Sequence, residues 1–209
     1  MSPRVGDRVQ ATIEYGKIQV FDDLVPGDVY ERLIRTARNV RWQFGKSTKE
    51  NPHARYWHFE IAGGQKSNVE DKSEIVAAHP LKVFGEFQNW LRGTLVPADT
   101  LVLRCYMNAH TFGSDGWPHK DTDRGDELTG VLYLAREWRP EWCGETAVFD
   151  DKGTDIEAAV LPRPNRLLVF PSDRLHAPRP LSRAYPGLRV VLVVKIAPAR
   201  GGSEFFSGR

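Results

Sequence analysis

The stretch Pro118-His119-Lys120-Asp121 decides the fold, because it places an imidazole and a carboxylate two residues apart. Residues i and i+2 of a β-strand point to the same face, so one short strand can direct His119 and Asp121 at a single ion. His176, far downstream, supplies a second imidazole. Two imidazoles and one carboxylate are the ligand set that holds non-haem Fe(II) and leaves coordination positions open. The sequence therefore predicts a metal site made of His119, Asp121 and His176, with His176 coming from a strand that lies alongside.

From residue 101 onward, short β segments alternate with turn residues such as Asp150-Asp151-Lys152-Gly153. The pattern predicts eight strands, at residues 101–107, 118–121, 127–134, 145–149, 158–161, 166–170, 175–178 and 189–196. Eight short antiparallel strands favour a double-sheet jelly roll, the double-stranded β-helix, with helices packed outside it. In this order the first two candidate ligands lie on the second strand and His176 lies on the seventh.

The first 95 residues are expected to form a helical region that supports the β core. After a short strand at 18–21, apolar residues recur at helical spacing over about 26–38. Pro80 is expected to open a second helix that ends near Gly93, and the polar stretch 63–72 is expected to be a loop. We therefore expect one domain over 1–209, with a support region 1–95, a jelly-roll core 100–197 and a flexible tail 198–209.

The composition is that of a soluble globular protein, with 41% hydrophobic and 27% charged residues. A net charge of +2 is too small to indicate binding to nucleic acid or to an anionic membrane. Only Cys105 and Cys143 occur, so no disulfide framework is indicated. The beginning of the chain lacks the apolar core of a secretory signal, and a cytoplasmic location is expected.

With these residues in this order, the sequence resembles the Fe(II)/2-oxoglutarate-dependent oxygenases, and within them the prolyl-4-hydroxylase-like branch. The resemblance covers about 18–197 in outline and 101–196 in motif detail. In that family the H-x-D motif lies on the second core strand and the distal histidine on the seventh. The resemblance implies Fe(II) as the metal, 2-oxoglutarate and O2 as cosubstrates, and ascorbate as a candidate stimulant. A carboxylate at Asp121 favours hydroxylation over halogenation, which needs a vacant position for chloride.

The resemblance also implies an anchor for the distal carboxylate of 2-oxoglutarate. Arg189 stands where the family has its basic anchor, at the start of the eighth strand, and its planar guanidinium suits a carboxylate. Tyr133, which precedes Leu134, matches a tyrosine that shares this carboxylate in animal hypoxia-sensing prolyl hydroxylases. Tyr106, which follows Cys105, matches a further tyrosine near the cosubstrate.

The segment from Trp138 to Phe149 resembles the W…GGE/L…F pattern of the family, with one departure. Cys143 stands where the first glycine of the usual Gly-Gly pair is expected. The loop between Tyr106 and His119 is also longer than in the family. Neither departure affects the candidate metal ligands.

Two further features allow more than one interpretation. His110 could face the substrate, but an exposed loop position is favoured. The stretch 41–58, rich in aromatic and basic residues, could form a lid over the substrate, but packing of its aromatic side chains between the helices and the β core is favoured.

The favoured function is a dioxygenase that hydroxylates, or otherwise oxidises, an unactivated C–H bond of a small molecule such as an amino acid or a biosynthetic intermediate. Release of succinate and CO2 is implied by the resemblance. One alternative is a peptidyl, prolyl-type hydroxylase that acts on a protein or peptide. A second is a non-catalytic β-barrel binding module, against which the full ligand set argues.

Overall fold

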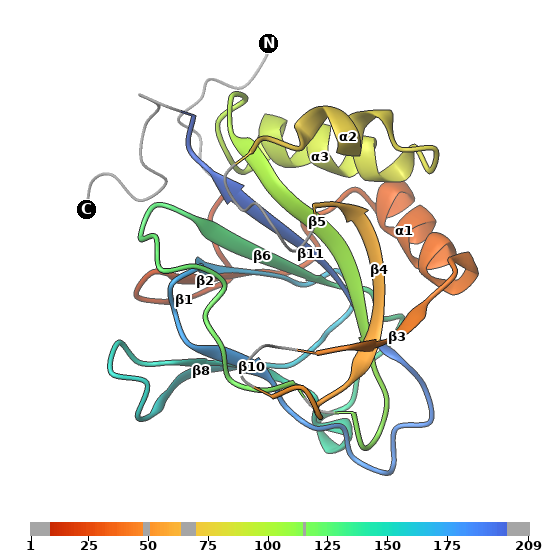
Figure 1. Ribbon diagram of the computed structural model, residues 1–209, viewed down its shortest axis with the longest axis vertical. Helices are drawn as coiled ribbons and strands as arrows, with labels where there is room; N and C mark the ends of the chain where they lie inside the picture. Colours follow the sequence, from red (N-terminus) through yellow and green to blue (C-terminus); the bar gives the residue numbers. More distant parts are fainter. Residues whose placement is uncertain (1–8, 48–50, 64–69, 115, 200–209) are drawn as a thin grey trace.

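Two antiparallel sheets face one another in the computed structural model, which describes residues 9–47, 51–63, 70–114 and 116–199 (Figure 1). The small sheet has the order β10 (His176–Pro178), β7 (Thr146–Phe149), β8 (Ile156–Val160). The large sheet runs, in order, β1 (Ile13–Tyr15), β2 (Ile18–Phe21), β9 (Leu167–Pro171), β6 (Leu128–Tyr133), β11 (Arg189–Ala197), β5 (Leu101–His110), β4 (Tyr56–Ala62) and β3 (Gln43–Lys46).

The predicted jelly roll is confirmed, and seven of its eight predicted core strands form within a few residues of the expected ends. The prediction of a regular strand at 118–121 is wrong. Only His119 pairs there, as an isolated antiparallel bridge to His176. Pro118 has no backbone N–H to extend the ladder, and the N–H of Asp121 instead donates to the carbonyl oxygen of Ser172, at 3.0 Å.

Within the described residues, three helices cover the outer face of the large sheet, where two were expected: α1 (Gly27–Asn39), α2 (Ser73–Ala78) and α3 (Val83–Thr94) (Figure 1). The helix expected from Pro80 begins at Val83, and α2 was not predicted. The residue before a proline avoids the α region, and His79 is extended with φ −56° and ψ 137°, so α2 ends before Pro80 and α3 begins after it. The predicted loop at 63–72 lies largely outside the described residues.

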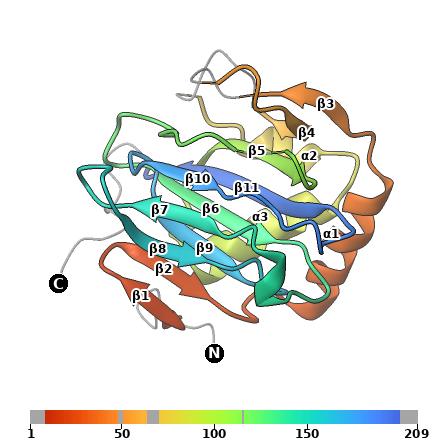
Figure 2. The ribbon, with the colours of Figure 1, turned by 90° about the horizontal axis from the view of Figure 1, so that it is seen from below.

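The support region 1–95 also contributes strands β1 to β4, so its description as helical was incomplete. A short 3₁₀ turn, η1 (Pro140–Trp142), precedes β7. Seen from below, β7, β8 and β10 lie across from the large sheet (Figure 2).

No helix in the described part of the chain is long and apolar enough to cross a membrane. The expected flexible tail lies outside the described residues from 200 onward.

The alternation of side chains along β11 separates two hydrophobic clusters. Leu192 and Val194 join the cluster between the helices and the large sheet, whereas Val191 and Val193 join the cluster between the two sheets. Since successive residues of a strand point to opposite faces, Arg189 and Lys195 share the inner face with Val191 and Val193. Two cationic side chains therefore enter the space between the sheets, one near each end of β11.

Candidate active site

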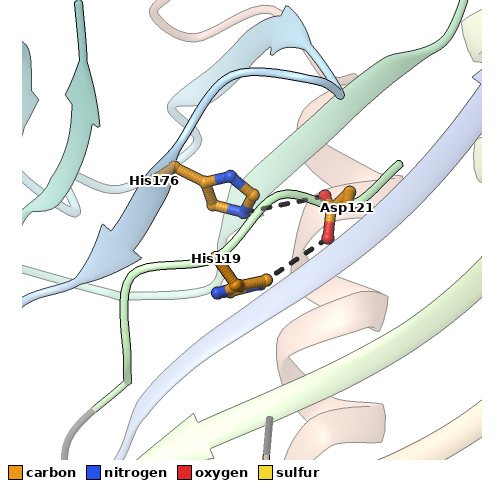
Figure 3. A group of neighbouring side chains, drawn as sticks. All are labelled: His119, Asp121 and His176. Carbon is orange, nitrogen blue, oxygen red and sulfur yellow. Dashed lines mark ion pairs between the residues drawn. The ribbon is translucent and has the colours of Figure 1, made fainter. Parts of the chain in front are cut away.

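Backbone pairing brings the three predicted ligands together. His119 and His176 exchange two backbone hydrogen bonds of 3.0 Å, which sets their rings side by side with centroids 4.4 Å apart. Asp121 lies across from both rings (Figure 3). Nε2 of His119 is 3.6 Å from one carboxylate oxygen of Asp121, and Nε2 of His176 is 3.6 Å from the other. The convergence that the sequence predicted is therefore present.

The orientation of both rings suits a metal. Nδ1 of His119 lies 2.8 Å from the carbonyl oxygen of Trp117, and Nδ1 of His176 lies 3.0 Å from that of Arg174. Each ring therefore donates its Nδ1–H to the backbone and turns the lone pair of Nε2 toward Asp121. One donor atom from each of the three residues lies within 4.8 Å of the others. Two neutral imidazoles and a carboxylate at this spacing fit the 2-His-1-carboxylate set of non-haem Fe(II).

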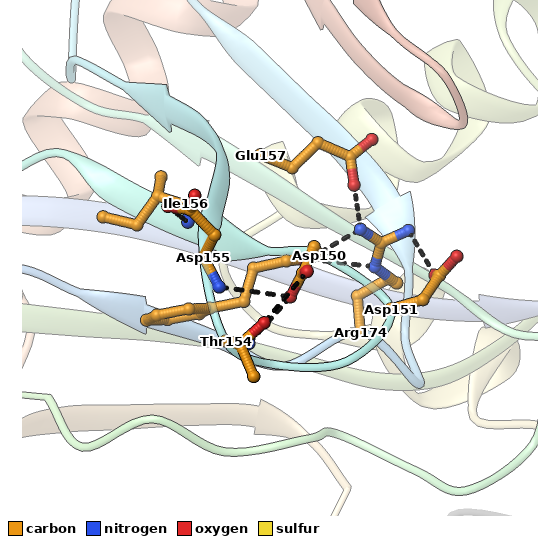
Figure 4. A network of polar contacts seen from close by, with 8 residues as sticks. Asp150, Asp151, Thr154, Asp155, Ile156, Glu157 and Arg174 are labelled. Atoms are coloured by element: carbon orange, nitrogen blue, oxygen red, sulfur yellow. Dashed lines mark hydrogen bonds and ion pairs between the residues drawn. The ribbon is translucent and has the colours of Figure 1, made fainter.

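The segment that carries His176 is fixed by the side chain of Arg174 (Figure 4). Its Nη2 and Nε donate to the carbonyl oxygen of Phe149, at 2.6 and 3.1 Å, and Nη1 lies 2.8 Å from Asp151. The same guanidinium also pairs with Glu157 on β8. These contacts tie the turn before β10 to β7 and β8, and so position the Arg174 carbonyl that orients the ring of His176.

Lys195 was not foreseen as part of the site. Its Nζ lies 2.6 Å from Oδ1 of Asp121, and Oγ1 of Thr129 donates to Oδ2 at 2.6 Å. Burial alone would raise the pKa of Asp121, but Lys195 and the two histidines outweigh it and hold the pKa well below the usual 3.8. The feature of the sequence that could have identified Lys195 is its position directly after the apolar run 190–194.

The two histidines have opposite pKa shifts although they face the same carboxylate. Burial lowers the pKa of His176 to about 4, against the attraction of Asp121. Burial also opposes charge on His119, but there the attraction of the Asp121 carboxylate prevails and raises its pKa. The side chain of His119 is 23% exposed and that of His176 only 8%, which agrees with this difference. The imidazole of His176 is thus neutral near pH 7, which is the form that can bind a metal.

Arg189 lies where the sequence placed it, as the first residue of β11, and is only 2% exposed. Its Nε donates to the carbonyl oxygen of Gly144 at 2.6 Å, and Nη2 donates to Oγ1 of Thr146 at 2.8 Å. Burial lowers its pKa below the usual value of an arginine, and no carboxylate of the described residues lies within 4.0 Å of its guanidinium nitrogens. A buried guanidinium with no carboxylate in direct contact indicates a place for an anion, which fits the distal carboxylate of 2-oxoglutarate.

The two predicted tyrosines differ in their access to the cavity. Tyr106 is one of its lining residues, and burial raises the pKa of its hydroxyl. Tyr133 is fully buried, and its hydroxyl shares its single proton between Oγ1 of Thr146, at 2.8 Å, and the carbonyl oxygen of Val160, at 3.2 Å. The guanidinium of Arg189 lies over its ring, 5.4 Å from the centroid. Contact of Tyr133 with the cosubstrate stays a prediction.

The cavity around the candidate ligands is lined by residues from β4, β5, β6, β7, β10 and β11 and from the segment 116–121. The sequence analysis did not predict Tyr56, Asn108 and Thr146 as cavity residues, since nothing in the local pattern marked them.

The expectation of an exposed loop for His110 is wrong, because β5 extends to this residue and His110 is 4% exposed in the cavity wall. In the stretch 41–58, Trp42 packs on the helical side, donating to the carbonyl oxygen of Ala37, whereas Tyr56 faces the cavity.

Comparison with known proteins agrees with this fold and site. The family model of the 2OG-Fe(II) oxygenase superfamily matches residues 103–194, which span β5 to β11 and contain all three candidate ligands. A comparison with curated protein sequences gives no match.

Solved structures share the fold at low sequence identity. A prolyl-4-hydroxylase from Pseudomonas putida is 17% identical, with a TM-score of 0.57, over 87% of this chain and 92% of that one. A Trichoplax adhaerens prolyl hydroxylase in complex with a hypoxia inducible factor peptide fragment is 14% identical, with a TM-score of 0.55, over 87% and 83%. HygX from Streptomyces hygroscopicus, with nickel, 2-oxoglutarate and hygromycin B bound, is 15% identical, with a TM-score of 0.57, over 88% and 83%.

The matched segment contains the core strands, the two histidines and the aspartate of the candidate metal site, and the buried Arg189. The surrounding fold is that of the prolyl-4-hydroxylase-like enzymes. Residues 103–194 therefore match the 2OG-Fe(II) oxygenase superfamily, and the chain shares the fold of prolyl-4-hydroxylase-like enzymes of that superfamily.

Proposed function

We propose that this enzyme oxidises an unactivated C–H bond of a small molecule, such as an amino acid or a biosynthetic intermediate, with hydroxylation as the outcome. The observation that carries the proposal is the convergence of His119, Asp121 and His176 at the wall of one cavity. When bound, Fe(II) and 2-oxoglutarate supply the oxidising power, with release of succinate and CO2.

The residues of the chain have separate roles in this proposal. His119, Asp121 and His176 hold the metal. Arg189 binds the distal carboxylate of 2-oxoglutarate, with Tyr106 and Tyr133 as further candidates for contact. The ring of Phe170 packs on the ring of His176, with centroids 4.7 Å apart, and gives that imidazole an apolar neighbour.

The form of the cavity supports a small substrate. Gly116, just before the H-x-D motif, lies so close to β10 that a Cβ on it would come 2.0 Å from Cγ of Pro178. Tyr56 and Asn108 line the cavity from β4 and β5. The closely packed backbone at Gly116 on one side and the ring of Tyr56 on the other restrict the size of the molecule that can approach the metal. HygX, with hygromycin B bound, is a relative in fold that holds a small molecule.

A peptide substrate is the second candidate. Phe112 and Trp117 are 52% and 47% exposed in the segment that leads to His119, and exposed aromatic side chains are frequent at protein interfaces. The Trichoplax adhaerens relative is in complex with a peptide fragment.

The test is 2-oxoglutarate turnover by the purified enzyme with Fe(II) and O2, measured as succinate, with a panel of amino acids and biosynthetic intermediates beside a panel of proline-containing peptides. We expect succinate release coupled to a metabolite that gains the mass of one oxygen atom. Coupled turnover with peptides alone would replace the first proposal by the second. Binding of Fe(II) and 2-oxoglutarate without any coupled turnover would favour a non-catalytic binding module.

A further inference from the structure

His110 and Arg189 lie directly opposite one another at the end of two paired strands. His110 is the last residue of β5, Arg189 is the first of β11, and the two are register partners. Directly opposed residues of antiparallel strands project to the same face of the sheet. Both residues line the cavity, and the ring of Tyr56 lies against His110, with centroids 5.0 Å apart.

The imidazole of His110 is buried without a hydrogen-bond partner. The residue is 4% exposed, and neither ring nitrogen has a partner in the part of the chain that the structure describes. A neutral imidazole carries one N–H donor and one acceptor, and burying both unpaired costs free energy because their hydrogen bonds to water are lost. The nearby His58, by contrast, is paired through both nitrogens, with Asn108 and Glu60. An unpaired donor in a cavity wall indicates a bound ligand that accepts from it.

The surrounding groups determine the kind of ligand. Burial, reinforced by the charge of Arg189, lowers the pKa of His110 to about 3, so the ring is neutral and keeps a single N–H at neutral pH. Thr146, beside Arg189 in the cavity wall, accepts from Arg189 and from Tyr133, which leaves its own hydroxyl proton to donate. A buried cation with two neutral donors close by matches a carboxylate.

We propose that His110 is a cosubstrate-binding residue whose ring N–H donates to the distal carboxylate of 2-oxoglutarate, beside Arg189. The inference rests on the proposed function of this site. His110 of β5 lies opposite Arg189, the first residue of β11. Lys195, which contacts Asp121, lies near the other end of β11, opposite Arg104 in the strand register. His110 therefore faces the far end of the cosubstrate rather than the metal.

The experiment compares two 2-oxo acids, one with and one without the distal carboxylate. Binding of 2-oxoglutarate and of 2-oxobutyrate is measured by calorimetry with Ni(II) as a redox-inert metal, so that no turnover is needed. For His110→Phe, which keeps an aromatic ring against Tyr56, we expect 2-oxoglutarate to bind about tenfold more weakly or worse, because a hydrogen bond to a charged group is lost. Binding of 2-oxobutyrate is expected to change by less than about twofold, since it has no carboxylate for His110 to contact.

Three further variants make the result specific. His110→Ala removes the donor without adding volume and is expected to weaken 2-oxoglutarate binding as His110→Phe does. His110→Gln supplies another N–H donor and is expected to recover most of the affinity. His79→Phe changes a histidine outside the cavity lining, on the link between α2 and α3, and is expected to bind both acids as the unaltered protein does.

Two results would overturn the inference while leaving the proposed function intact. One is unchanged binding of 2-oxoglutarate by both His110→Phe and His110→Ala. The other is an equal loss of affinity for both acids, which would make His110 a support of the cavity wall rather than a contact of the carboxylate. If the unaltered, Ni(II)-loaded protein bound no 2-oxoglutarate at all, the proposed function itself would fail, and this inference with it.

Discussion

Lys195 Nζ lies 2.6 Å from Oδ1 of Asp121, and the two side chains are only 5% and 4% exposed. The pair joins β11 to the segment that follows the His119 bridge. A buried ion pair contributes little net free energy, but loss of one partner leaves a lone buried charge. Lys195 therefore compensates the charge of Asp121 whenever no metal does so.

The metal-free protein provides the test of this pair. We expect Lys195→Met to lower the free energy of unfolding by about 3–5 kcal/mol, as for other broken buried pairs. The double variant Lys195→Met/Asp121→Asn should be more stable than Lys195→Met, because it does not bury a carboxylate that has lost its cationic partner Lys195. Urea unfolding in the presence of a chelator measures both. A double variant no more stable than Lys195→Met would show that the ion pair is not what the lysine provides.

His176→Ala should abolish metal-dependent turnover and leave the fold largely intact. One of three ligands is lost, so we expect Fe(II) affinity to fall by more than about a hundredfold, beyond the effect of changing a residue that only supports a ligand. Anaerobic Fe(II) titration and circular dichroism measure the two properties. His53→Ala, at an exposed turn, is the matched control and should bind Fe(II) normally. Full activity of His176→Ala would contradict the ligand assignment.

Arg189→Ala should mainly raise the requirement for 2-oxoglutarate. A charge-assisted hydrogen bond is typically worth about 1.5–3 kcal/mol, so we expect the KM for 2-oxoglutarate to rise by about tenfold to a hundredfold, with much of kcat recovered at saturation. Arg183→Ala changes an exposed arginine that stacks on Phe112 and serves as the control. An unchanged KM in Arg189→Ala would place the anchor elsewhere.

Cys143 occupies a backbone conformation that suits glycine, with φ 55° and ψ −139°. A side chain there costs on the order of 1–3 kcal/mol, part of which a glycine loses again to its greater freedom in the unfolded chain. We expect Cys143→Gly to raise the free energy of unfolding by about 1 kcal/mol, measured by chemical denaturation. Cys143→Ala keeps a Cβ and should give no such gain. Equal stabilisation by both substitutions would exclude backbone strain as the cause.

The Asp22–Arg166 pair should contribute to stability in a pH-dependent way. Arg166 donates to both carboxylate oxygens of Asp22, at 2.6 and 2.8 Å, and this hydrogen bonding lowers the pKa of Asp22 below 3.8 against the opposing effect of burial. A carboxyl group with a lowered folded pKa stabilises the protein above its unfolded pKa and loses that contribution as the pH falls through the folded value.

We therefore expect Asp22→Asn to be less stable than the unaltered protein at neutral pH. The difference should shrink as the pH falls below 3.8, where Asp22 takes up its proton. Urea unfolding across this pH range measures it. Stability curves that stay parallel at acidic pH would contradict the assignment.

Much of the fold could be predicted because its signals are local. Alternation of apolar residues and the intervening turns placed seven of eight core strands, and the H-x-D spacing indicated the metal site, whereas Arg189 was indicated by the family resemblance. The prediction failed where the pairing of strands, and not the local sequence, determines the structure. The segment 118–121 has strand-like residues, but only His119 finds a partner there.

The sequence by itself determined the ligand types, their order along the chain and the strands that carry them, because side-chain chemistry and strand periodicity are local properties. Only the tertiary structure decided which distant groups meet. Lys195 reaches Asp121, and His110 faces Arg189, because antiparallel register sets which side chains stand opposite one another. Tyr133 lies on the predicted strand, yet the packing of β7 and β8 against β6 gives its hydroxyl to Thr146 and Val160. Contacts of this kind depend on the fit between sheets, which no short stretch of sequence contains.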